Sequence, residues 1–149
     1  MKKLSVEFAS FLLVLLFTYT SFSKLLDLKL YAFQMRLSPW YPIKIAAEFL
    51  AWTVPLCEAG IVLMLLFTAT RIYGLLVSLI LLSLFELYIA GLLLSGLDLP
   101  CTCGGIISML SWKQHIGLNA VLIFFTAVAI LNYDRGNKQV TNRAPFLHV

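Results

Sequence analysis

Charged side chains are scarce in this sequence. Only 12% of its 149 residues are charged, whereas 61% are hydrophobic, and the mean hydropathy is +0.94. A typical soluble domain carries about 25% charged residues, so the chain has roughly half the charge that a water-facing surface needs. This shortage excludes most soluble functions and favours a lipid bilayer as the environment of the protein.

Motifs for several common chemistries are missing as well. Nothing in the sequence resembles a Ser-His-Asp arrangement, a phosphate-binding loop or a haem motif. There is no basic run with interleaved aromatic residues, so we expect no nucleic-acid partner. The basic residues instead lie at the ends of the chain and in the first loop, which is typical of charges that orient membrane spans.

Four apolar segments are long enough to cross a bilayer, which requires about 20 mainly apolar residues per helix. We expect spans at residues 6–26, 45–67, 72–94 and 112–133, with a kink tolerated at Pro55. The start of the chain also fits a signal peptide, but its apolar run is long for a signal core, so we expect it to be retained. The sequence thus predicts an all-α, integral membrane four-helix bundle, forming a single domain over residues 1–149.

The segment between the first two spans, residues 28–37, is too short and too charged to cross the membrane. Lys29 and Arg36 share one helical face, while Leu30, Phe33 and Leu37 share another. This pattern suits a short helix that lies at the membrane interface. An ordinary polar connector with some apolar residues fits equally well.

The even number of spans places both termini on one side of the membrane and the loop at residues 96–111 on the other. With cytoplasmic termini, six Lys and Arg residues lie inside and five outside, a small bias that agrees with the positive-inside rule. We therefore expect a multi-pass protein of the cell inner (plasma) membrane, with a cytoplasmic tail at residues 134–149 and an extracytoplasmic loop. The outside set consists of Lys24, Lys29, Arg36, Lys44 and Lys113.

This loop contains Cys101 and Cys103, preceded by Pro100 and followed by Gly104 and Gly105. Residues two apart reach disulfide distance only in a bent backbone, which Pro and Gly favour. A bridge in so short a ring is strained, and strained, exposed disulfides are typical of labile or catalytic sites. The pair therefore indicates a thiol–disulfide exchange site, and the oxidising conditions outside the cytoplasm agree with the expected orientation.

Two other interpretations of the pair are open. It could be a structural disulfide that pins the loop, although so short a ring gains little entropy. It could belong to a metal site with His115, but this spacing does not match the common zinc patterns, so we expect no metal. Cys57, near the middle of the second span, is expected to pack in the core as a small hydrophobic residue.

Ionisable residues inside the spans are the next candidates, because they are costly in a membrane and usually functional. The alternating directions of the spans bring Lys24, Glu48, Glu86 and His115 into the half of the bundle that holds the cysteine loop, with Glu58 slightly past the centre. These residues predict a polar pocket that opens towards the cysteines. Glu48 and Lys24 could also be a purely structural ion pair, and the role of Glu58 is open.

Trp112, His115 and Asn119 share one face of the last span. His115 is a candidate catalytic residue that could take the proton of a reacting thiol, since only the thiolate reacts. Hydrogen bonding between helices explains His115 equally well. For Trp112 and Asn119, which we also assign to the polar pocket, this structural role is favoured.

Several segments in combination point to a known family. They are residues 19–27, Pro55-Leu56-Cys57-Glu58, residues 70–75, residues 100–105 around the cysteine pair, and residues 111–115 with Asn119. With them the chain resembles the MauE branch of the DoxX-like membrane proteins, four-helix proteins associated with redox functions, over essentially its whole length.

The resemblance implies a thiol–disulfide role for Cys101 and Cys103. MauE itself serves the maturation of methylamine dehydrogenase, whose small subunit is rich in disulfides, alongside a thioredoxin-like partner; methylamine as a substrate is not implied. The architecture is also similar to vitamin K epoxide reductase and DsbB-type enzymes, which pass electrons from thiols to quinone. Those enzymes carry Cys-x-x-Cys rather than Cys-x-Cys, so a quinone cofactor stays open.

Three functions are therefore considered. The leading one is a membrane thiol–disulfide oxidoreductase or electron conduit that acts on an extracytoplasmic thioredoxin-like partner. The alternatives are a non-enzymatic assembly or maturation factor, and a small-molecule carrier whose intramembrane carboxylates line a path. A carrier has no need of the cysteine pair, which favours the first function.

Overall fold

The computed structural model describes the backbone of residues 2–95 and 112–143, and the side chains of residues 4–95 and 114–133. Throughout these ranges the regular structure is helical, without a strand. The all-α prediction is therefore confirmed. The helices are α1 (Lys2–Leu26), α2 (Leu28–Arg36), α3 (Tyr41–Ile45), α4 (Ala47–Leu66), α5 (Arg71–Leu94) and α6 (Trp112–Arg143).

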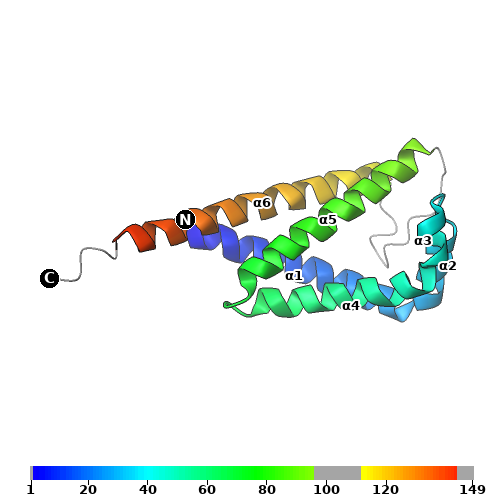
Figure 1. Ribbon diagram of the computed structural model, residues 1–149, viewed down its shortest axis with the longest axis horizontal. Helices are drawn as coiled ribbons and strands as arrows, with labels where there is room; N and C mark the ends of the chain where they lie inside the picture. The colour runs from blue at the N-terminus through cyan, green and yellow to red at the C-terminus, as the bar shows by residue number, and fades with distance from the viewer. Residues whose placement is uncertain (1, 96–111, 144–149) are drawn as a thin grey trace.

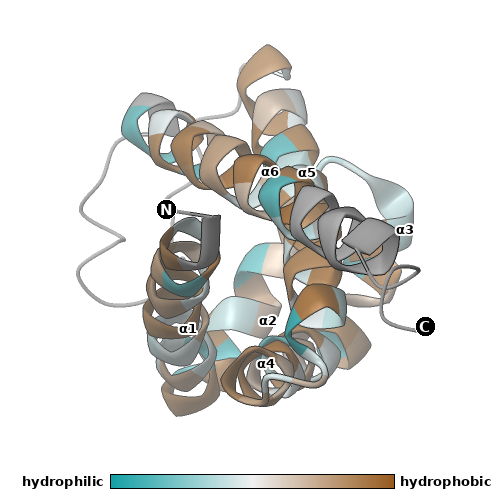
Figure 2. Cartoon of the chain, turned by 90° about the vertical axis from the view of Figure 1, so that its left-hand side faces the viewer, coloured by the Kyte–Doolittle hydropathy of each residue, from teal (hydrophilic) through white to brown (hydrophobic). Residues whose placement is uncertain are grey.

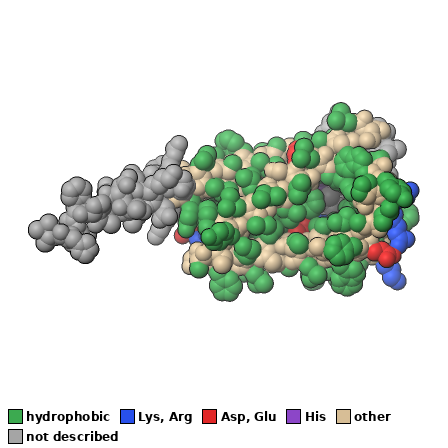
Figure 3. Space-filling model, in the orientation of Figure 1, with side chains coloured by type: hydrophobic (Ala, Val, Ile, Leu, Met, Phe, Trp, Pro, Cys, Tyr) green, Lys and Arg blue, Asp and Glu red, His purple; other side chains and the backbone are tan. Residues whose placement is uncertain are grey.

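Four of these helices are long and apolar enough to cross a membrane. They contain the segments Leu4–Leu26, Ala47–Leu66, Arg71–Leu94 and Gln114–Tyr133, each within two residues of the expected span. Their outer faces expose large apolar side chains, such as Phe49 at 72% and Leu94 at 90%. Apolar residues predominate along the helices (Figure 2), and hydrophobic side chains are spread over the face seen in the space-filling view (Figure 3). Such surfaces are stable in contact with lipid rather than water.

The long helices form two pairs that diverge along the bundle. In Figure 1, α1 and α4 separate from α5 and α6 towards the end where α2 and α3 lie. At the opposite end α4 and α5 are joined by a short turn, and Gly74 allows close packing, because a Cβ atom there would lie 3.0 Å from Leu65 Cδ2. The hydrophobic core is a cluster that includes Leu13, Phe17 and Leu82. The two pairs are therefore closely packed at the turn end, and their backbones lie further apart at the other end (Figure 1).

The short helices α2 and α3 lie across the wide end of the bundle (Figure 1). The expected helix between the first two spans is thus confirmed, with Leu30 and Phe33 exposed at 47% and 57%. Trp40 attaches this region to α5: its ring centroid lies 5.3 Å from that of Tyr88. The same indole lies directly over Gly91, where a Cβ atom would come within 2.3 Å of it. The contact holds α2 and α3 against the end of α5.

Candidate functional site

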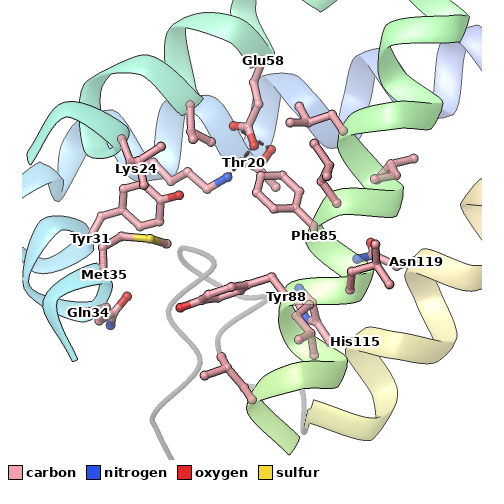
Figure 4. A pocket seen from close by; sticks show the side chains of 18 of the residues that line it. Thr20, Lys24, Tyr31, Gln34, Met35, Glu58, Phe85, Tyr88, His115 and Asn119 are labelled. Atoms are coloured by element: carbon pink, nitrogen blue, oxygen red, sulfur yellow. Dashed lines mark hydrogen bonds and ion pairs between the residues drawn. The ribbon is translucent and has the colours of Figure 1, made fainter. Parts of the chain in front are cut away.

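A cavity of about 610 Å³ occupies the wide half of the bundle. All six helices contribute side chains to it, and most of those side chains are apolar. Ligand sites typically have volumes of about 300–1,000 Å³ and combine apolar walls with a few polar groups. Figure 4 shows two sets of polar side chains on separate walls of the cavity. One set comes from α1 and α4, and the other from α5 and α6. The cavity is therefore the candidate site.

The wall formed by α1 and α4 contains a buried ion pair. Lys24 Nζ donates a hydrogen bond to Glu58 Oε1, and Thr20 Oγ1 donates one to Glu58 Oε2 at 3.3 Å. Lys24 is 6% exposed and Glu58 1%. The ammonium group also lies 5.5 Å from the ring centroid of Tyr31 and 4.9 Å from that of Phe85. Both charges are thus compensated, as burial in a membrane requires, and the wall carries no net charge.

The wall formed by α5 and α6 holds His115, Asn119 and Tyr88 (Figure 4). His115 and Asn119 are four residues apart on one face of α6, and each is 7% exposed. A side-chain hydrogen bond joins Asn119 to Glu86 on α5. His115 Nδ1 and Glu86 Oε2 are buried without a hydrogen-bond partner. An unsatisfied buried polar atom is unfavourable, so His115 Nδ1 marks a position that a ligand group could fill.

The structure brings together part of the expected polar pocket. Lys24, His115 and Asn119 line the cavity. Glu86 does not line the cavity itself, but its side chain is hydrogen-bonded to Asn119, which lines it. The side chain of Trp112 lies outside the described residues, as do Cys101 and Cys103.

Glu48 does not line the cavity, and the alternative in which it pairs with Lys24 is not what the structure shows. Glu48 pairs instead with Arg36 of α2, where the two side chains are 77% and 54% exposed. The reason is helical phase, since Glu48 lies one residue after the buried Ala47 and so turns away from the bundle. The partner of Lys24 is Glu58, which belongs to the buried face of α4.

The sequence did not show that Glu58 faces inward, because apolar residues occur on every side of α4. The buried residues of this helix are spaced three or four apart, the period of one helical face, and Glu58 falls in that series: Ala47, Ala51, Pro55, Glu58, Ile61 and Leu65. The sequence gave no signal for Tyr31, Phe85 and Tyr88 either, because aromatic residues occur all along the chain; these three also line the cavity.

The expectation for Cys57 is also wrong. Its side chain is exposed on the outer surface of α4, next to the buried Glu58 in sequence but on a different face of the helix. In a membrane this surface contacts lipid, so Cys57 acts as a small apolar residue outside the core.

Among the described residues, no group of three or more His, Cys, Asp or Glu residues could hold a metal ion.

Comparison with known proteins gives one family. The family model described as Methylamine utilisation protein MauE matches residues 2–132. That range includes the first three candidate spans, the fourth except its last residue, and every residue that lines the cavity. Neither the curated proteins nor the solved structures compared with this chain include a significant match.

Proposed function

Because this chain belongs to the MauE family of multi-pass membrane proteins, we propose that it is a membrane thiol–disulfide oxidoreductase that acts through Cys101 and Cys103. One observation supports this proposal most directly. The wall of the cavity that holds His115 is built from α5 and α6, the two helices connected by residues 96–111. The cysteine pair thus stands in the segment between the two helices that carry the polar groups of this wall.

The proposed reaction is reversible exchange with a thioredoxin-like protein outside the cytoplasm. A thiolate of the pair attacks a disulfide sulfur of the partner, a mixed disulfide forms, and the released partner thiolate takes a proton. The second cysteine then attacks the mixed disulfide. Two electrons and two protons pass to the partner, which becomes a dithiol, while Cys101 and Cys103 become a disulfide. In this direction a lipid-soluble quinol then returns two electrons and two protons to the Cys101–Cys103 disulfide and becomes a quinone. In the reverse direction the partner's two thiols reduce the Cys101–Cys103 disulfide. Two electrons and two protons then pass from these cysteines to a quinone, which becomes a quinol as the disulfide re-forms.

His115 is proposed as the group that exchanges protons with the thiols. It lies in the first turn of α6, which begins at Trp112, and its Nδ1 is not engaged by the described residues. A histidine in such a position can hold the proton that a reacting thiol releases. Replacing it should slow exchange without preventing the mixed disulfide from forming.

We propose an orientation in which both termini are cytoplasmic. Figure 1 shows the start of α1 and the far end of α6 at one end of the bundle, and α2 and α3 at the other. In this orientation six Lys and Arg residues lie inside and five outside, Lys24 among the latter. This small bias agrees with the positive-inside rule and supports the proposed orientation.

Trapping tests the proposed function. The Cys103→Ser variant removes the resolving thiol, so Cys101 should accumulate as a mixed disulfide with its partner. We expect mass spectrometry to identify a partner with a thioredoxin-like fold, attached through its own redox-active cysteine. The Cys101→Ser/Cys103→Ser variant should give no adduct, and Cys57→Ser should behave like the unmodified chain.

The same experiment separates the alternatives. An assembly factor would bind its partner without a disulfide, so the complex would survive in the double variant. A carrier would give no adduct in any variant and would lose transport when Glu58 or Glu86 is replaced. Either of these results, together with a Cys101–Cys103 pair that does not cycle between disulfide and dithiol in glutathione buffers, would contradict the exchange mechanism.

A further inference from the structure

We infer that the cavity is a binding site for a neutral, lipid-soluble ring compound with carbonyl oxygens, of the quinone class. The site itself is defined by the described residues alone. Only the role of the bound quinone as the electron acceptor rests on the proposed function. Four properties of the cavity support this inference: its volume, its net charge, its aromatic side chains and its unsatisfied imidazole nitrogen.

The charge of the cavity selects a neutral ligand. Its cationic side chain, Lys24, already pairs with Glu58, and both are buried. An anion would compete with Glu58 for Lys24 and leave a buried carboxylate without a partner, which is strongly unfavourable. A cation would compete with Lys24 in the same way. A neutral molecule leaves the pair intact, and the mainly apolar lining favours a molecule that partitions into lipid.

The side chains around the ion pair favour a ring over a plain alkyl chain. Tyr31 and Phe85 flank the Lys24 ammonium group, and Tyr88 lies on the opposite wall beside His115 (Figure 4). Aromatic side chains pack against flat rings in stacked or edge-to-face contacts, which add to the stabilisation from buried area. The cavity, at about 610 Å³, has the volume of a typical site for a compound of this size.

Carbonyl oxygens satisfy the polar groups on the two walls. An ammonium group has three N–H donors, and Glu58 Oε1 takes a hydrogen bond from Lys24. His115 Nδ1 has no partner, although the residue is only 7% exposed. An oxygen on one edge of a ring can accept a hydrogen bond from Lys24, while an oxygen on the other edge pairs with a protonated Nδ1. A para-quinone has this arrangement of acceptors.

Equilibrium binding of a decyl benzoquinone to the full chain in detergent micelles tests the inference. Quenching of tryptophan fluorescence reports binding, because Trp40 lines the cavity. We expect His115→Leu to weaken binding about three- to tenfold, the effect of one lost hydrogen bond. Val54→Trp, which fills the cavity, should weaken it tenfold or more. Phe124→Leu is the matched control, since Phe124 is 64% exposed on the outer face of α6; its affinity should be unchanged.

Two further measurements separate a specific site from partitioning and from thiol chemistry. Decanoate, an anion with a similar tail, should bind at least tenfold more weakly than the quinone. Equal binding of both probes, or quinone affinity that is the same in His115→Leu, Val54→Trp and Phe124→Leu, would overturn the inference. Melting temperatures of the same samples show whether each variant is folded. Because His115→Leu and Val54→Trp change different parts of the cavity, either one tests the site if the other does not fold.

Variants of Cys101 and Cys103 distinguish a failure of the quinone site from a failure of the proposed thiol exchange. Quinone affinity should be unchanged in Cys101→Ser/Cys103→Ser, because no sulfur atom takes part in binding. Specific binding in this variant, combined with failure to trap a partner, would refute thiol exchange and leave the site intact. A trapped partner combined with nonspecific quinone binding would refute the site and leave the exchange function intact.

Discussion

At the scale of single residues, the central feature is the compensation of buried charge. Lys24 and Glu58 lie on different helices, 34 residues apart in sequence, and meet inside the bundle with support from Thr20. Arg36 and Glu48 make a second pair, but at the exposed end of the bundle. The two pairs have the same chemistry in different environments, and the environment determines what each contributes to stability.

The first prediction compares these pairs. Lys24→Met leaves Glu58 buried and unpaired, and we expect the unfolding free energy in micelles to fall by about 3–5 kcal/mol. The double variant Lys24→Met/Glu58→Leu should recover most of this loss, because no uncompensated charge remains. The matched control is Glu48→Gln, which breaks the exposed pair and should cost less than about 1 kcal/mol. Equal losses for Lys24→Met and Glu48→Gln would show that the Lys24–Glu58 pair is not buried in the folded protein.

At the scale of elements, the contact between the α2–α3 region and α5 depends on one glycine. The Trp40 indole lies over Gly91, so this position has no room for a side chain. Trp40 also lines the cavity. The short helices are therefore attached to the bundle through a residue that forms part of the candidate site.

The second prediction follows from this contact. Gly91→Ala would place a methyl group 2.3 Å from the indole, so Trp40 must move. We expect a loss of about 1–3 kcal/mol from overpacking, with a change in the tryptophan emission spectrum and weaker quinone binding. Gly60→Ala on α4 is the control, because nothing lies within 4 Å of its added Cβ, and alanine favours the helix by up to about 1 kcal/mol. Gly91→Ala that behaves like Gly60→Ala would show that Trp40 is not packed on α5.

At the scale of the whole molecule, the bundle has two dissimilar halves. The half with the α4–α5 turn is filled by the hydrophobic core, whereas the other half contains the cavity and is covered by α2 and α3. In the proposed orientation the wide half faces the extracytoplasmic side. This places the polar groups of the cavity on the side where disulfides persist.

The third prediction concerns topology. A membrane-impermeant maleimide applied to intact cells after reduction should label Cys101 and Cys103. Cys57 should stay unmodified, because it faces lipid from within a span and a hydrophilic reagent does not enter the bilayer core. The Cys101→Ser/Cys103→Ser variant, which retains only Cys57, is the control and should give no signal. Labelling that appears only after permeabilisation would reverse the proposed orientation.

The sequence by itself determined the helices and their lipid environment. Runs of about 20 apolar residues have few alternatives to a membrane-spanning helix, since backbone groups in lipid must be satisfied within the segment. The four candidate spans accordingly lie close to their expected bounds. The amphipathic pattern of residues 28–37 suited a short helix but fitted an ordinary connector equally well, and the structure has the helix α2 there.

Only the tertiary structure decided which polar residues meet. Depth along the span suggested Glu48 as the partner of Lys24, but depth does not specify which way a side chain points. The phase of α4 turns Glu48 outward to Arg36, brings Glu58 inward to Lys24, and exposes Cys57 to lipid. A rotation of 100° per residue separates neighbours on a helix, so the direction in which each helix packs decides between partners that look equivalent in sequence.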